Sequence, residues 1–352
     1  MKRLFFFFLL MLVTQLAITQ TVNGTVIDAK SKQPLQDVSV YFDATTIGTI
    51  TNKNGVFNLL KKENVNTPLV ISYLGYKTIT LNPSQLTNNL KVELEISDFE
   101  LDEVILSDDT WSREKKLKHF KREFLGKHQA ALDCEILNVD HINLYYSSVK
   151  QILYASSDQP IVVKNKYLGY NIYYQISEFE IHFKNINNVR IKSDGITRSF
   201  ELVNFVLLTG YSRFENINPK RVKSKYLKRR EQQFKVSSLY FMRSLSENKL
   251  IENGFRLYIK DPSGKSNLFF ETLTDRVFKI EKNDNKATKI TFIKPQRVTV
   301  SLINLEQASI IPNQDHFFID DYGVFFPIKN ISFSGAFGKE RLSVMLPLNY
   351  NL

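Results

Sequence analysis

The chain is poor in cysteine and in the residue spacings that metal and nucleophile sites require. Cys134 is its one cysteine among 352 residues, so no disulfide can form within the chain. None of the five histidines has a glutamate three residues later, and the motifs His-Glu-x-x-His, Gly-x-Ser-x-Gly and Gly-x-x-x-x-Gly-Lys-Ser/Thr do not occur. The sequence therefore predicts no catalytic, cofactor-binding or metal-binding residue, and Cys134 is expected to be a small buried residue.

Long hydrophobic runs are also lacking, apart from one at the start of the chain. Lys2 and Arg3 precede an apolar run over residues 4–13 and a more polar stretch with small residues. This pattern predicts a signal peptide over residues 1–19, with cleavage before Gln20. No later stretch approaches the roughly 18 apolar residues that a membrane-spanning helix needs. We therefore expect an exported mature chain without a transmembrane span, located in the periplasm, at the outer membrane or outside the cell.

Positive charge is concentrated in the later part of the chain. The formal net charge is +11, yet residues 20–105 carry 7 Lys and Arg against 10 Asp and Glu. Residues 106–352 are therefore strongly basic. Because an exported protein rarely meets nucleic acid, we expect an anionic lipid or glycan, or an envelope protein, as the partner.

Residues 21–81 alternate apolar and polar side chains in short runs, and Gly, Pro, Asn or Lys clusters separate the runs. This period of two predicts short antiparallel strands. Within the stretch GTITNKNGVFNL, at residues 48–59, Asn54 and Gly55 suit a two-residue type I′ turn, which predicts a hairpin. Residues 20–105 are therefore expected to form a small all-β domain.

The same residues resemble a known family. The strings GTVIDAKSKQPLQDVSVYFDATTIGTITNKNGVFNL, LVISYLGYKTITL and LKVELEISDFELDEVIL are similar to the carboxypeptidase-regulatory-like domain. The matching positions are Gly24, Pro34, Leu35, Val38, Val40, Gly48, Thr49, Thr51, Gly55, Phe57, Leu59, Ser72, Tyr73, Gly75 and Tyr76. The resemblance implies a seven-stranded prealbumin-like, immunoglobulin-like sandwich. It also implies an accessory rather than a catalytic role, and a Bacteroidota source, where such domains precede TonB-dependent transporters.

Residues 106–352 are predicted to form an α+β domain built mainly on antiparallel sheet. TWSREKKLKHFKREFLG, at residues 110–126, has apolar residues at helical spacing and a terminal glycine. Runs rich in Tyr, Ile, Phe and Val then predict strands, and residues 218–259 predict two helices. Several strings here resemble the uncharacterised C-terminal region that accompanies this sandwich in exported Bacteroidota proteins.

A basic stretch at residues 220–235 is the candidate contact surface for an anionic partner. The cations proposed to make this contact are Lys220, Arg221, Lys223, Lys225, Lys228, Arg229 and Arg230. Glu231 is the only acid in the stretch. The alternative interpretation is a helix face whose charges are simply solvated.

Together these features predict a non-enzymatic binding or scaffolding protein of the bacterial cell envelope. Two alternatives remain open at this point. One is an envelope hydrolase whose site lies in residues 106–352 and has no sequence motif. The other is an accessory protein of a TonB-dependent transport system.

Overall fold

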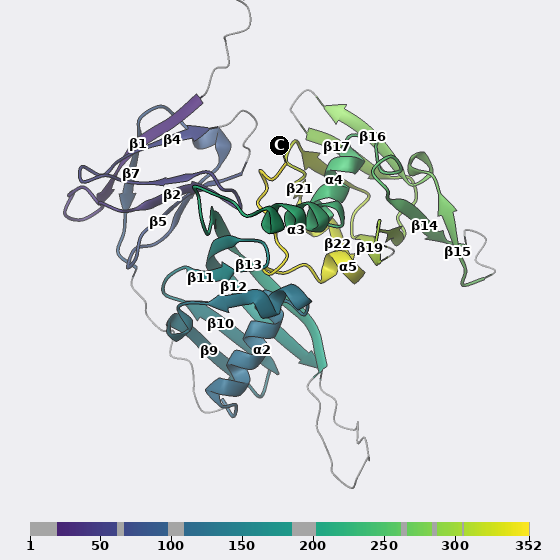
Figure 1. Cartoon of the computed structure of the whole chain (residues 1–352), viewed down its shortest axis with the longest axis horizontal. Coiled ribbons are helices and arrows are strands. Elements are labelled where there is room, and N and C mark those ends of the chain that lie inside the picture. Colours follow the sequence, from purple (N-terminus) through teal and green to yellow (C-terminus); the bar gives the residue numbers. More distant parts are fainter. Residues whose placement is uncertain are drawn as a thin grey trace, which may run out of the picture.

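The chain forms three hydrophobic cores in the computed structural model (Figure 1). The residues that the structure describes are 20–61, 67–97, 109–184, 202–261, 266–283, 287–304 and 306–351. The signal peptide predicted at 1–19 and the domain junction predicted at 105/106 lie outside them. In the described part of the chain, no helix is both long and apolar enough to cross a bilayer.

The first core lies between two small sheets. One sheet has the order β4-β1-β7, with β1 at Gln20–Asp28, β4 at Val56–Lys61 and β7 at Leu90–Leu94. The other has the order β3-β2-β5-β6, with β2 at Ser39–Phe42, β3 at Gly48–Ile50, β5 at Leu69–Ser72 and β6 at Ile79–Leu81. Alternate residues of these strands, such as Val26, Val40 and Phe57, are buried between the sheets. The predicted seven-stranded sandwich is confirmed.

The hairpin predicted at residues 48–59 is wrong. Strand β3 pairs with β2 and strand β4 pairs with β1, so this stretch crosses from one sheet to the other. The Asn52 side chain accepts hydrogen bonds from the backbone N–H groups of Asn54 and Val56, at 2.9 and 3.0 Å. Only Gly55 of the turn has a positive φ, 71°, and a Cβ there would lie 2.4 Å from the Val26 carbonyl oxygen. Gly55 is therefore needed because β1 passes so close to it.

The second core lies between helix α2 and an antiparallel sheet of six strands. The order is β8-β11-β12-β10-β9, and β13 pairs with β12. The elements are α2 (Arg113–Leu125), β8 (Cys134–Ile136), β9 (Ile142–Ser147), β10 (Ile152–Ser157), β11 (Ile161–Asn165), β12 (Tyr170–Lys184) and β13 (Leu202–Asn216). Helix α2 begins after the capping residue Ser112, buries Phe120 and Phe124 at the predicted helical spacing, and ends at the predicted glycine, Gly126, with φ 99°.

The third core lies between two further antiparallel sheets and includes residues of the second of the two helices predicted after residue 218. The helices are α3 (Ser224–Lys235) and α4 (Ser238–Ser246), with the short α5 at Gly335–Gly338. The five-stranded sheet contains β15 (Phe269–Thr272), β14 (Arg256–Lys260), β18 (Val298–Ser301), β19 (Gln307–Pro312) and β22 (Ile331–Ser334), in that order. The four-stranded sheet contains β16 (Phe278–Asn283), β17 (Ala287–Phe292), β20 (His316–Asp320) and β21 (Phe325–Phe326). The predicted α+β, mainly antiparallel character of this part is confirmed.

The last residues of the chain connect all three cores. Leu342 and Leu346 belong to the second core, and Leu348 packs against the first. Arg243 is a buried residue of α4, the helix that contributes to the third core. It donates hydrogen bonds to the carbonyl oxygens of Leu348 and Tyr350, at 2.6 and 2.8 Å. The three cores therefore share one junction.

Candidate functional site

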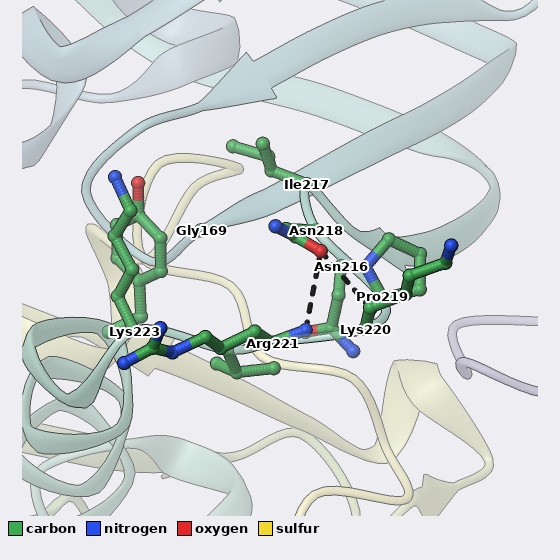
Figure 2. Close-up of a pocket in the computed structure, with 10 residues that line it drawn as sticks. Gly169, Asn216, Ile217, Asn218, Pro219, Lys220, Arg221 and Lys223 are labelled. Carbon is green, nitrogen blue, oxygen red and sulfur yellow. Dashed lines mark hydrogen bonds between the residues drawn. The ribbon is translucent and has the colours of Figure 1, made fainter.

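A pocket of about 490 Å³ lies where β13 leads into α3, at the start of the basic stretch (Figure 2). Lys220, Arg221 and Lys223 line it, and no described residue of the lining carries a carboxylate. The other lining residues are Gly169, Asn216, Ile217, Asn218, Pro219, Val222 and Tyr226. Three of the ten lining residues are therefore cationic.

Local hydrogen bonds give the loop that carries these cations its shape. The Asn218 side chain accepts from the backbone N–H groups of Lys220 and Arg221, at 3.1 and 3.2 Å (Figure 2). The backbone N–H of Ile217 donates to the Gly169 carbonyl oxygen at 3.1 Å. Asparagine favours such turns because its side chain can accept from backbone groups two or three residues ahead. The loop is thus fixed at both ends of the pocket.

Gly169 and Tyr226 also line the pocket and contact each other, although they come from distant parts of the sequence. Gly169 has a φ of 75°, and a Cβ at this position would lie 2.3 Å from the Tyr226 ring. Only glycine allows this close contact between the ring and the backbone. Lys223 is the residue that precedes α3, and its side chain does not cap the helix. The positive end of the helix dipole therefore adds to the charge of the three cations.

Arg230 is buried, although its position in the basic stretch predicted that it would lie on the contact surface. It is 4% exposed, and its guanidinium donates to the carbonyl oxygens of Leu168 and Gly169 at 2.7 and 3.0 Å. It also donates to the Asn216 side chain at 2.9 Å and lies 3.6 Å from the centre of the Tyr170 ring. Arg230 is therefore a structural residue, and the prediction that it contacts an anionic surface is wrong.

The burial of Arg230 nonetheless bears on the charge of the pocket. All its hydrogen-bond acceptors are neutral, and within the described residues no carboxylate pairs with it. Burial lowers its pKa from the usual value, which reflects the cost of keeping the charge away from water. Asn216 lines the pocket and also accepts from Arg230, so this buried charge lies directly behind the pocket wall.

The other members of the candidate surface differ in how accessible they are. Lys225 and Lys228 are exposed on α3, outside the pocket lining. Arg229 is half-buried, donates to the Tyr167 carbonyl oxygen at 3.2 Å and lies 3.7 Å from a carboxylate oxygen of Asp133. The structure therefore brings Lys220, Arg221 and Lys223 together, leaves Lys225 and Lys228 in solvent, and engages Arg229 and Arg230 internally.

The remaining candidates for chemistry have ordinary structural roles. The Cys134 thiol donates to the Ala130 carbonyl oxygen at 3.4 Å, and burial raises its pKa to about 12, as expected for an unreactive thiol. Asp320 accepts from the backbone N–H groups of Tyr322 and Val324, both at 2.9 Å, and holds the turn after β20. Across the described ranges, no cluster of three or more His, Cys, Asp or Glu side chains could hold a metal ion.

Comparison with known proteins assigns the first sandwich. Residues 22–106 match one family model. This part of the chain is a CarboxypepD_reg-like domain. A search of the curated proteins found no match. The family match thus covers the CarboxypepD_reg-like domain and stops before helix α2.

Solved structures show only weak similarity. Two are mutants of a type II cohesin-X-dockerin complex from Acetivibrio cellulolyticus, at 18% and 20% identity. They cover 32% and 34% of this chain and 83% and 85% of theirs, with TM-scores of 0.20 and 0.19. A third, from Bacteroides fragilis, is a protein of unknown function described as membrane-associated. It is 10% identical over 90% of this chain and 94% of its own, with a TM-score of 0.17. Scores this low support no inference about function.

The CarboxypepD_reg-like domain contacts the strand that leads into the pocket. The Asp43 side chain accepts from the backbone N–H of Ser212, and the backbone N–H of Ala44 donates to the Ser212 carbonyl oxygen, both at 2.7 Å. The backbone N–H of Phe214 donates to the Thr45 carbonyl oxygen at 3.0 Å. The turn between β2 and β3 therefore supports β13 just before the pocket begins at Asn216.

Proposed function

We propose that the protein is a non-enzymatic binding protein of the bacterial cell envelope, and that it holds a phosphate group of an envelope lipid or glycan. The pocket between β13 and α3 is the binding site. The observation that supports this proposal is the lining by Lys220, Arg221 and Lys223 without a carboxylate, in front of the buried Arg230.

The chemistry of these side chains suits a phosphate group. Arg221 has a planar guanidinium that can donate two parallel hydrogen bonds to phosphate oxygens, whereas Lys220 and Lys223 act as flexible point charges. Three like charges around one pocket repel each other, and a bound dianion removes that repulsion. The neutral acceptors around Arg230 leave its charge uncompensated, so its field also favours an anion at Asn216.

The envelope location and the domain division are part of the proposal. The predicted signal peptide at 1–19 supports export, to the periplasm or the outer membrane. We assign residues 20–105 to the CarboxypepD_reg-like domain and residues 106–352 to the part that carries the site. The contact between Asp43 and Ser212 supports a scaffolding role for the first domain, because it holds the strand that carries the site.

Binding is tested with the mature chain, residues 20–352, and two sources of phosphate. One is phosphatidylglycerol in phosphatidylcholine vesicles, with pure phosphatidylcholine as the blank, and the other is glucosamine 6-phosphate. The variant K220S/R221S/K223S removes the cations of the pocket. The control K30S/K53S/K91S removes the same charge from exposed lysines of the first domain.

The pocket variant is expected to bind at least about 10-fold more weakly than the wild type, since each charged hydrogen bond contributes about 1.5–3 kcal/mol. The control should bind like the wild type at 0.15 M salt. Selective binding to anionic vesicles identifies a lipid as the source, and binding to the sugar phosphate identifies a glycan. Equal weakening by both triple variants, or no binding to either source, contradicts the proposal.

A further inference from the structure

Strand β15, at Phe269–Thr272, exposes an unusual amount of apolar surface. It is the last strand of the five-stranded sheet, at the outer side of the third part of the molecule (Figure 1). Leu268, Phe269, Phe270 and Leu273 are 64%, 52%, 49% and 56% exposed. Single exposed apolar residues are common, but four within six residues of one edge strand indicate a contact surface.

The backbone of β15 is also available on its outer side. Its register with β14 pairs Ile259 with Phe270 and Tyr258 with Glu271. The backbone N–H of Asp261 donates to the Leu268 carbonyl oxygen at 3.0 Å, so the hydrogen-bonded pairs of this ladder include Leu268 and Phe270. Because such pairs alternate along an antiparallel ladder, Phe269 and Glu271 direct their N–H and C=O groups away from β14. The strand therefore presents both apolar side chains and outward backbone groups.

These two features together define what can cover β15. A lipid surface would bury the apolar side chains, but it would leave the outward N–H and C=O groups without partners in an apolar medium. A partner strand satisfies the backbone groups and covers side chains on both faces of the sheet at once. The outward backbone groups therefore favour a strand over a membrane.

We propose that β15 pairs with β15 of a second copy of this chain, antiparallel about a two-fold axis at Phe270. In this register Phe269 of each copy lies opposite Glu271 of the other, and these are the residues whose backbone groups point outward. Each of the two Phe269–Glu271 pairs can then exchange two backbone hydrogen bonds. The two copies of Phe270 lie directly opposite each other, where aromatic side chains interact favourably.

The register with the axis at Glu271 fits less well. A two-fold axis at Glu271 would place two carboxylates opposite each other, whereas the axis at Phe270 keeps them apart. In its own copy, Glu271 lies 3.4 Å from the guanidinium of Arg256. Arg256 therefore balances the charge of Glu271 when Glu271 lies opposite Phe269 of the other copy. The dimer is isologous, with the same short strand on both sides. This inference is independent of the proposed phosphate site.

The register is tested by disulfide trapping in a C134S background, which removes the native thiol. Residues at a non-hydrogen-bonded antiparallel pair have Cα atoms about 4.5 Å apart, within the range for a disulfide. F270C should therefore form a disulfide-linked dimer under mild oxidation. E271C is the matched control, because its two copies lie diagonally across the axis at more than about 7 Å.

Sedimentation velocity of the wild type and of F270K completes the test. The wild type should show a dimer whose fraction rises with concentration, and F270K should stay monomeric, because it places two cations opposite each other. Far-UV circular dichroism checks that each variant is folded. Equal crosslinking of both cysteine variants overturns the proposal, as does a wild type that is monomeric up to about 0.1 mM. Vesicle binding that F270K abolishes would also overturn it, because lipid would then be the occupant.

Discussion

Substituting Arg230 by methionine should destabilise the second core, whereas the same substitution at Lys228 should not. The two residues lie on the same helix, α3, and both are cations of the basic stretch. Arg230 donates three hydrogen bonds to Leu168, Gly169 and Asn216, whereas Lys228 is exposed. Comparing the two variants therefore distinguishes a cation with a structural role from a cation on the surface.

The expected loss can be worked out from these contacts. Arg230→Met leaves the Leu168 carbonyl oxygen and the part-buried Asn216 side chain without this donor, which costs about 1 kcal/mol each at the lower end of the range, whereas the Gly169 carbonyl oxygen still accepts from the N–H of Ile217. Losing the contact of the guanidinium with the Tyr170 ring, at 3.6 Å, adds about 1 kcal/mol. Removing a buried cation recovers part of this, since its desolvation is no longer required. We expect a net loss of about 2 kcal/mol for Arg230→Met, and a change within about 0.5 kcal/mol for Lys228→Met.

Trp111 provides a local assay of this loss. It is the single tryptophan of the chain, and its ring stacks on Tyr146 at the edge of the second core, with centroids 3.8 Å apart. Its fluorescence therefore reports the unfolding of the core that contains Tyr170. A destabilisation of 1 kcal/mol lowers the Tm of a unit of 150–250 residues by about 2–4 °C, so Arg230→Met should lower it by about 4–8 °C. Equal Tm values for the two variants would refute the structural assignment.

Two further substitutions test the packing around β13. Burial raises the pKa of Asp43 to about 6, so the folded chain keeps a proton that the unfolded chain releases between about pH 4 and 6. Stability from this group should fall as the pH rises through that window, and Asp43→Asn should remove this dependence in thermal melts recorded from pH 4 to 7. At Gly210, a Cβ would lie 2.1 Å from the Gln175 carbonyl oxygen of the neighbouring strand. Gly210→Ala should therefore cost about 2 kcal/mol or more in urea titrations of Trp111 fluorescence, and an unchanged midpoint would contradict this contact.

The strand pattern of the first domain could be predicted because alternation reports burial directly. Val26, Val40 and Phe57 belong to runs in which apolar or small residues recur every second position, and all three are buried between the sheets. The pairing of the strands could not be predicted in the same way. Asn54-Gly55 suggested a hairpin, but pairing depends on contacts such as the approach of Val26 to Gly55, which lie far apart in the sequence.

The pocket could be predicted only in part for the same reason. Lys220, Arg221 and Lys223 are close in sequence, so the basic stretch revealed them. Gly169 and Asn216 line the same pocket because β12 and β13 are paired, and no local pattern reports that pairing. The Asn218-Pro219 pair was a usable signal, because asparagine before proline is typical of a turn.

Arg230 also shows what distinguishes this site from a merely basic surface. Charges on an exposed helix face are screened by salt and attract any anion weakly, so they give little specificity. A buried guanidinium with neutral acceptors is screened much less, and its hydrogen bond to Asn216 brings its charge close to the pocket lining. In the proposed phosphate site, Lys220, Arg221 and Lys223 would supply attraction at long range, and Arg230 would favour an anion beside Asn216. The sequence shows both kinds of cation as one run of lysine and arginine, and only the burial of Arg230 separates them.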